Sequence, residues 1–293
     1  MSTLIRWRAA TASTLLLGLA ACSDEGAGPS GGALTQAQAE FAAEAVTDDA
    51  DAQGDILSSE TVGDASFSVA AFAPFGAQCT PRPTASPAPT DQDGDIVPDS
   101  VRFTFDPPCV LSLPLRTITR SGIIDVVDPT PTDLDWARRV RFVDFLTTRE
   151  RLVSGAIVSA LRNGVREING NPDALQHDVT GFVTVFTHAN GSVTTHTRTW
   201  SSDFTADTPG SIARNQALPS GTWTIGGTST WARENAVWSA SVTTDQALHY
   251  DAGCTEAPRF DAGVLTLVVT RGGNASTVTI EYAGCGEYVV TRS

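Results

Sequence analysis

The chain has 293 residues, 41% of them hydrophobic, which is enough to bury a real core as one large domain or two small ones. Its 19 basic residues are all arginine and face 33 acidic residues, so the net charge is −14. The absence of lysine excludes a P-loop lysine, a Schiff base and a Ser–Lys nucleophile. The acidic balance argues against nucleic acid as a partner.

The first 21 residues have the organisation of a secretory signal peptide. Arg6 and Arg8 form a short basic segment, and an apolar stretch follows over residues 9–21. As a helix this stretch rises only about 20 Å, too short for a permanent span of a hydrocarbon core about 30 Å thick. We therefore predict that residues 1–21 are a cleaved signal peptide.

The end of this segment is more specific. Leu19-Ala20-Ala21-Cys22 resembles the lipobox of bacterial lipoproteins. The resemblance implies that Cys22 receives a diacylglycerol and a further acyl chain, and several chains make membrane attachment effectively permanent. Ser23 stands where an aspartate commonly retains such lipoproteins at the inner membrane, so the resemblance implies the outer membrane, on its periplasmic or surface face. The alternative is an ordinary signal peptide that leaves Cys22 unmodified.

The start of the mature chain reads as a tether followed by a helix. Residues 22–33 are rich in glycine, serine, proline and acids, which is typical of a flexible, here lipidated, tether. Apolar residues at helical spacing then predict a short helix that fades into an acidic linker, together residues 34–55. The residues with this spacing are Leu34, Ala37, Phe41 and Ala45.

Beyond this helix, short alternating runs rich in threonine, valine and aromatic residues recur between turn residues. This pattern predicts an all-β fold, an antiparallel sandwich or open barrel made of hairpins. Residues 152–168 are ambiguous between helix and strand, and Gly155 and Asn163-Gly164 favour strands. A weak repeat around the cysteines indicates two related β units, residues 56–170 and 171–293, although 56–293 is also consistent with one domain. The predicted strands cover residues 66–72, 101–105, 122–127, 139–146, 181–188, 192–200, 222–225, 228–233, 236–243, 263–270 and 277–282.

Cysteine usage agrees with export. Lipidation of Cys22 leaves four cysteines, and exported chains meet oxidising conditions, so two disulfides are the natural interpretation. Of the three possible connectivities we prefer Cys79–Cys109 with Cys254–Cys285, each closing a loop of about thirty residues that stabilises the fold by roughly 3–4 kcal/mol. No Cys-x-x-Cys is present, which argues against zinc, haem and thiol redox chemistry.

The strongest chemical motif is an acidic loop over residues 91–99. Carboxylates at alternate positions of a tight turn converge on one centre, and Ca²⁺ takes six to eight such oxygens. The run resembles the calcium loops of thrombospondin type-3-like repeats on bacterial surface proteins, although only one copy is present and it does not follow the EF-hand pattern. The resemblance implies side-chain ligands from Asp91, Asp93, Asp95 and Asp99, and a carbonyl ligand from Val97. The alternative is a solvated acidic turn.

Histidines and tryptophans are the next candidates. A two-residue turn at Asn190-Gly191 would put His188 and His196 on opposite faces of a hairpin, which argues against a metal pair. A turn at Glu234-Asn235 places Trp231 opposite Trp238, a pair that we interpret as core rather than as a ligand platform. Gly226-Gly227 is a further predicted turn, and Trp223 is expected on the other face.

Searches for enzyme motifs find no Gly-x-Ser-x-Gly elbow, no His-Glu-x-x-His and no glycine-rich dinucleotide loop. We therefore expect a non-catalytic binding or structural module whose protein or glycan partner is unknown. One alternative is a surface polysaccharide hydrolase, which needs two carboxylates paired across a groove, such as Asp203, Glu234 or Glu281. A second alternative is a periplasmic carrier with an apolar cavity.

Overall fold

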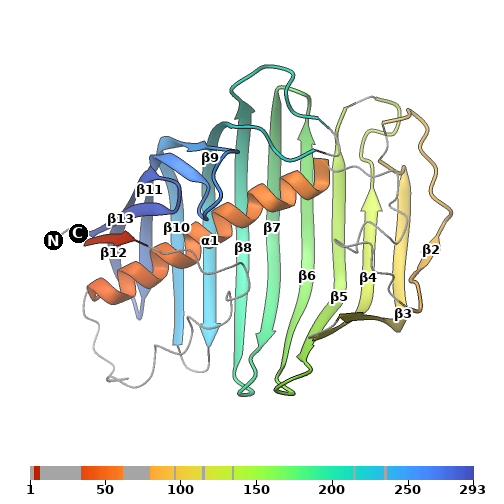
Figure 1. Cartoon of the computed structure of the whole chain (residues 1–293), viewed down its shortest axis with the longest axis horizontal. Helices are drawn as coiled ribbons and strands as arrows, with labels where there is room; N and C mark the ends of the chain where they lie inside the picture. Colours follow the sequence, from red (N-terminus) through yellow and green to blue (C-terminus); the bar gives the residue numbers. More distant parts are fainter. Residues whose placement is uncertain are drawn as a thin grey trace.

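A computed structural model describes residues 3–6, 34–61, 80–95, 97–113, 116–133, 135–213, 216–233 and 236–293. Its strands form one antiparallel sheet of 13 strands, in which β2 to β13 follow one another in chain order and β1 pairs with β13 (Figure 1). The sheet stays open, with β1 and β2 at its edges. The prediction of an all-β antiparallel fold of hairpins with one N-terminal helix is therefore confirmed.

The strands are longer than the predicted runs, because residues on both sides of each predicted strand continue its pairing. Of residues 152–168, which were ambiguous in the sequence, 157–168 lie in β6, as Gly155 and Asn163-Gly164 indicated, and 152–156 form the turn before it. Strands from both predicted β units belong to the same sheet. The strands are β1 Thr3–Arg6, β2 Thr84–Ser86, β3 Ser100–Leu113, β4 Arg116–Val127, β5 Arg138–Arg151, β6 Ile157–Gly170, β7 Ala174–Thr187, β8 Val193–Ala206, β9 Gly221–Arg233, β10 Ala236–Tyr250, β11 Phe260–Arg271, β12 Asn274–Gly284 and β13 Glu287–Arg292.

β1 lies within the predicted signal peptide. It pairs antiparallel with β13, with Thr3 opposite Val290 and Arg6 opposite Glu287. Removal of residues 1–21 would therefore leave β13 as the edge of the sheet. The predicted strand at 66–72 and the tether at 22–33 lie outside the described residues.

The single helix of the described chain, α1 (Gln36–Thr61), crosses one face of the sheet (Figure 1). Its start is a capping box, because the Gln38 N–H donates to Thr35 Oγ1 and the Thr35 N–H donates to Gln38 Oε1. Its buried face consists mostly of small side chains, which let the helix approach the strands closely: Ala39, Ala42, Ala43, Val46 and Ala50. Within the part of the chain that the structure describes, no helix combines the length and the apolar run that a bilayer span requires.

The helix runs further than its sequence pattern predicts, through the acidic stretch that was expected to be a linker. Aspartate is a poor helix former, so propensity alone argues for a break here. Tertiary ion pairs override that preference. Asp49 contacts Arg198 of β8, and Asp51 contacts Arg259 in the loop before β11, so this acidic segment is held against the sheet by two arginines.

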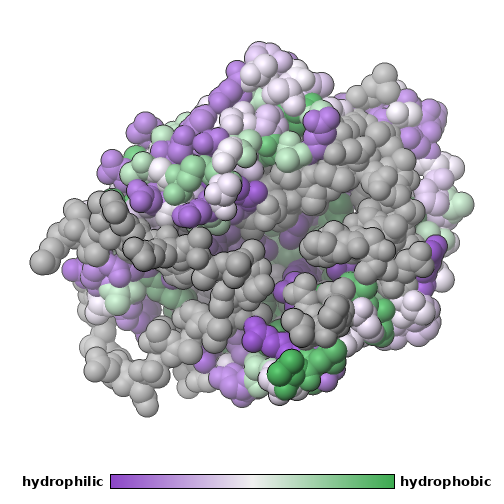
Figure 2. Space-filling model, in the orientation of Figure 1, coloured by the Kyte–Doolittle hydropathy of each residue, from purple (hydrophilic) through white to green (hydrophobic). Residues whose placement is uncertain are grey.

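The turns at the two ends of the sheet differ in character. The end that carries the β5–β6, β7–β8 and β9–β10 turns presents exposed aliphatic residues, and Figure 2 shows a hydrophobic patch at its lower edge, below the β5–β6 hairpin of Figure 1. The opposite end holds the long loops, including the acidic loop before β3 and the loop between β8 and β9.

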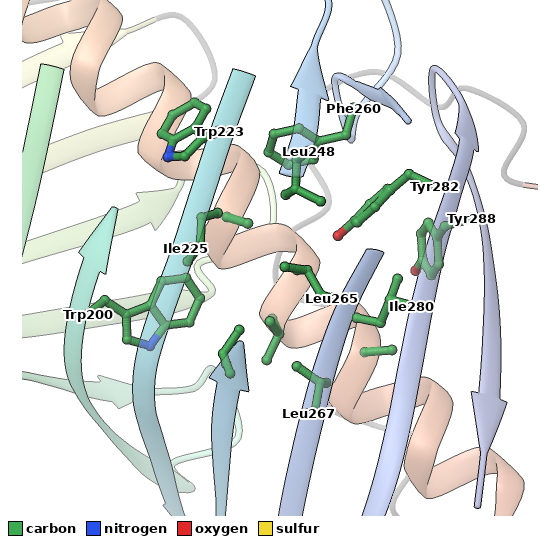
Figure 3. Close-up of a cluster of buried hydrophobic side chains, with 14 of the residues drawn as sticks. Trp200, Trp223, Ile225, Leu248, Phe260, Leu265, Leu267, Ile280, Tyr282 and Tyr288 are labelled. Atoms are coloured by element: carbon green, nitrogen blue, oxygen red, sulfur yellow. The ribbon is translucent and has the colours of Figure 1, made fainter. Parts of the chain in front are cut away.

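The main core lies between α1 and the face of the sheet that it covers, called here the inner face. Side chains from β8 to β13 gather there, and Trp223, Phe260, Leu265 and Ile280 are completely or almost completely buried (Figure 3). Thr47 of α1 forms a buried hydrogen bond with the Tyr282 hydroxyl, with 2.9 Å between the oxygens. A smaller cluster around Phe103 and Phe105 fills the inner face of β3 to β5.

Two predicted turns lie inside strands. Gly226-Gly227 is part of β9, where Gly227 has φ +141° and its missing side chain leaves room for the Thr199 carbonyl of β8. Asn163-Gly164 lies within β6, and Gly164 packs directly against Phe182. Since β9 is continuous, Trp223 is on the same face as Trp231 and belongs to the core, so its predicted placement on the other face is wrong. In this sheet such glycines mark close approach of strands rather than reversal of the chain.

Candidate functional site

The acidic loop lies between β2 and β3, at the long-loop end of the sheet. Asp91, Asp93 and Asp95 each offer a carboxylate oxygen, and these three oxygens lie within 4.8 Å of one another. Asp95 is buried with 2% of its surface exposed, whereas Asp91 is exposed. The structure thus brings three of the predicted ligands together.

Local hydrogen bonds shape this cluster. The Gly94 N–H donates to Asp91 Oδ1 at 2.8 Å, the Asp95 N–H to Asp93 Oδ1 at 3.0 Å and the Val97 N–H to Asp95 Oδ1 at 2.7 Å. Each aspartate therefore caps the turn that follows it, which is why alternate aspartates curl the chain. Gly94 adopts φ +79°, a conformation that glycine accepts without steric cost.

Asp99 has a different place from the other three. Its Oδ2 accepts from the Thr90 hydroxyl at 2.8 Å and its Oδ1 accepts from the Gln92 N–H at 2.9 Å. It therefore closes the base of the loop instead of joining the cluster of three oxygens. Val97 is buried beside it, at the entry to β3.

Asp128 is a further buried carboxylate beside this loop that the sequence did not indicate. It follows β4, and its N–H donates to the Asp99 carbonyl at 3.3 Å because Ser100 and Val127 pair across β3 and β4. Only 3% of Asp128 is exposed, and its Oδ2 has no hydrogen-bond partner. The same is true of Oδ2 of Asp93. Burial, with a further contribution from the nearby Asp93 charge, raises the pKa of Asp128.

These orphaned oxygens fit a cation. Buried polar atoms are normally satisfied, and a carboxylate left without a partner beside other carboxylates is destabilising. A hard divalent ion takes several oxygens at once and tolerates irregular geometry when it is Ca²⁺. Asp91, Asp93 and Asp95 are the residues in position to hold such an ion, and Asp128 lies near enough for the Asp93 charge to act on it.

The cysteines follow the predicted connectivity where the structure describes them. Cys254 and Cys285 form a disulfide, as predicted, which links the loop after β10 to the turn after β12. Cys109 of β3 is also disulfide-bonded. Its predicted partner Cys79, like the predicted lipidation site Cys22, lies outside the described residues.

A buried polar group sits on the inner face beneath α1. Asp49 Oδ1 accepts from Arg198 at 3.0 Å, and Asp49 Oδ2 lies 3.3 Å from Nε2 of His196. Burial raises the pKa of Asp49 to about 6, and burial together with the Arg198 charge lowers that of His196 to about 3. At neutral pH the group is therefore a carboxylate paired with arginine beside a neutral imidazole.

The predicted histidine geometry is wrong. Thr187 pairs with Val193 and Thr184 with His196, one residue away from the predicted register, because the β7–β8 turn spans residues 188–192 rather than two residues. A slip by one residue reverses every side chain, so His188 and His196 share the inner face. Among the described residues they do not belong to a cluster with metal-ligand spacing.

The tryptophan pair is confirmed as core. Trp231 lies opposite Trp238 and stacks on it with ring centroids 3.8 Å apart. His196 stacks on Trp231, and Phe41 of α1 contacts Trp238 edge-on. Both broad faces of Trp231 are therefore occupied by rings of the protein itself.

His249 joins two carboxylates at the long-loop end. Its Nδ1 lies 2.6 Å from Asp261 and its Nε2 lies 2.9 Å from Asp207. Hydrogen bonds to Asp207 and Asp261 raise the pKa of His249. The sequence showed only an isolated histidine, because its partners lie on β11 and in the β8–β9 loop.

The carboxylates suggested for a hydrolase are not brought together. Asp203 lies on β8 and Glu281 on β12, with three strands between them, which is about 19 Å along a sheet. Glu234 lies outside the described residues. Comparison with protein families, with curated proteins and with solved structures gives no match for this chain.

Proposed function

We propose that this chain is a lipid-anchored, non-catalytic binding or structural module of the bacterial cell envelope, held at the outer membrane through Cys22. The observation that carries the non-catalytic part is α1, which occupies the inner face where a curved sheet would otherwise receive a ligand. The basic, apolar and small-residue order that ends at Cys22 supports the anchor.

Ca²⁺ is the structural cofactor in this proposal. The unpartnered oxygens of Asp93 and Asp128 support it, because a bound cation would satisfy both and offset the repulsion within the cluster. Extracellular modules bind Ca²⁺ at roughly 10⁻⁴–10⁻³ M, so millimolar calcium stabilises the fold by about 0.4–1.4 kcal/mol. The role of the ion is to order the loop against the β3–β4 end.

Fractionation of cells that express the protein and its Cys22→Ser variant tests the anchor. The wild-type protein is expected in the outer-membrane fraction after a carbonate wash, with an acylated amino-terminal peptide by mass spectrometry. The variant is expected in the soluble fraction. A variant that still sediments with the outer membrane after the wash contradicts an anchor at Cys22.

Calorimetry or thermal melting tests the cofactor. The melting temperature is expected to rise by a few degrees in 10 mM calcium, about tenfold or more above the expected Kd, and to return with chelator. Asp93→Ala combined with Asp95→Ala should abolish the rise while the far-ultraviolet circular dichroism stays unchanged. If calcium leaves the melting temperature of the wild type unchanged, the loop is a solvated acidic turn and not a calcium site.

A carrier of an amphiphilic ligand is the second candidate. It is favoured by the inner face near β5 to β8, where Arg166 lies 4.7 Å from the Phe182 ring and 5.4 Å from the Phe142 ring. Arginines over aromatic rings offer both charge and apolar surface to one ligand. Native mass spectrometry of the purified protein distinguishes the two functions, because a carrier should retain a ligand of constant mass.

A further inference from the structure

Exposed aliphatic side chains concentrate at one end of the sheet. The structure describes seven large hydrophobic residues that are exposed, and five of them lie in or beside the β5–β6, β7–β8 and β9–β10 turns. Val153 is 87% exposed. The five are Leu152, Val153, Ile157, Val193 and Val237. In a sheet of consecutive hairpins alternate turns share one end, so these side chains form part of a common edge, called here the hairpin end.

The charge of the hairpin end is opposite to that of the whole chain. Its five turns, each taken with four strand residues on either side, carry five arginines and two glutamates. The six turns at the opposite end, counted in the same way with all three residues of β2, carry six arginines and seventeen acids. A chain with net charge −14 therefore has a basic hairpin end and an acidic opposite end.

Basic and apolar groups meet most closely on the β5–β6 hairpin. Arg149 and Arg151 are exposed on β5, directly before Leu152 and Val153 in the turn. On the β9–β10 hairpin, which the β7–β8 hairpin separates from β5–β6, Arg233 is followed closely by Val237, which is 56% exposed. The arginine stems are long enough to reach headgroup phosphates while the aliphatic tips enter the acyl boundary.

We propose that the hairpin end docks on an anionic lipid surface, with the aliphatic turn residues inserted at the interface and the arginines on lipid phosphates. Charge complementarity favours this occupant, because basic groups at a membrane surface gain from anionic lipids. The exposed valine and leucine tips favour lipid over a polyanion such as a nucleic acid, which offers no apolar layer. Docking does not require Cys22, and it directs the acidic loop away from the membrane.

The orientation is tested with the full chain carrying Cys22→Ser, so that no acyl chain contributes. Val153→Cys is labelled with an environment-sensitive fluorophore, and Val268→Cys serves as the matched control, because Val268 is 42% exposed but lies inside β11, about 13 Å of strand before the β11–β12 turn. The probes are vesicles of phosphatidylcholine with and without phosphatidylglycerol. We expect a blue shift at Val153 with phosphatidylglycerol vesicles, quenched by spin-labelled lipids, and no shift at Val268.

Partition measurements separate the two contributions. Leu152→Ser with Val153→Ser should lower the partition coefficient about tenfold, whereas Val268→Ser should leave it unchanged. Arg149→Gln with Arg151→Gln should lower it about fivefold per arginine and flatten its salt dependence.

Three results overturn the proposal. If the protein binds vesicles but the fluorophore at Val153 shows no blue shift, another surface of the protein contacts the lipid. If Val268→Ser lowers the partition coefficient as much as Leu152→Ser with Val153→Ser does, the turn residues are not the specific lipid contact. Binding to heparin without binding to vesicles makes the hairpin end a polyanion site instead. Because Cys22 is absent in every arm, none of these outcomes bears on the lipid anchor.

Discussion

Replacing Asp51 with alanine tests whether the acidic half of α1 is held by its contacts with the sheet. The Asp51 carboxylate accepts from Arg259 Nε at 3.1 Å and from Arg259 Nη2 at 3.2 Å, and it also accepts from the Arg259 backbone N–H at 2.9 Å. The two side chains are only 13% and 20% exposed. The substitution therefore removes a bidentate pair and leaves a backbone donor without its partner.

The expected cost follows from this burial. Breaking a buried ion pair from one side costs about 3–5 kcal/mol, because a charge is left uncompensated in a poor solvent. Both side chains keep some exposure to solvent. We therefore expect Asp51→Ala to lower the free energy of unfolding by about 3 kcal/mol, near the lower limit of this range. For a protein of this size that corresponds to a fall in melting temperature of about 6–12 °C.

A matched pair on the surface provides the control. Arg102 and Asp125 have the same bidentate geometry, at 2.7 and 3.1 Å, but the Arg102 side chain is 54% exposed. Exposed pairs contribute little, so Asp125→Ala should lower the melting temperature by at most about 4 °C. Equal effects of Asp51→Ala and Asp125→Ala, by circular dichroism melting, would refute the argument from burial.

Three further predictions concern pH, calcium and the disulfide. The pKa of Asp49 is raised to about 6 by burial, so its carboxylate destabilises the fold at neutral pH, and the destabilisation is relieved as pH falls from about 6 to 4. Asp49→Asn should remove this pH dependence, so that the rise in stability between pH 7 and pH 4 that the wild type shows in urea titrations is absent. Asp128→Asn should stabilise the calcium-free protein and reduce its calcium-induced rise in melting temperature, whereas an undiminished rise would exclude Asp128 as a ligand. Non-reducing peptide mapping should recover Cys254 linked to Cys285 and a second link from Cys109, and a free Cys109 thiol would contradict the second bridge.

Features that depend on neighbouring residues in the chain were predictable from the sequence. The alternation of apolar and polar residues predicted the strands. The two-residue turn between β9 and β10 predicted that Trp231 stands opposite Trp238. The Asp91–Asp95 spacing predicted converging oxygens because each aspartate bonds an N–H a few residues later. In these cases the cause lies within one hairpin or one turn.

Features that depend on distant partners were not predictable. Asp51 stabilises a helix that its own propensity disfavours, because Arg259 stands 208 residues away in the chain. Asp128 joins the acidic loop only through the pairing of β3 with β4. The β7–β8 register depended on the turn length, and an error of one residue was enough to place His196 on the wrong face.

The position of α1 sets an order on assembly of the protein. Leu34 at its start donates its N–H to Ser276, 242 residues later, and the helix packs on β11, β12 and β13. In this meander each strand pairs with the one made just before it, so the sheet can grow hairpin by hairpin as the chain emerges. The helix is synthesised before the main run of hairpins and finds its partner surface only when the last hairpins are complete. A chain that stops short of β12 therefore has a sheet without the strands that complete the surface under α1, and it leaves part of an alanine-rich apolar helix exposed.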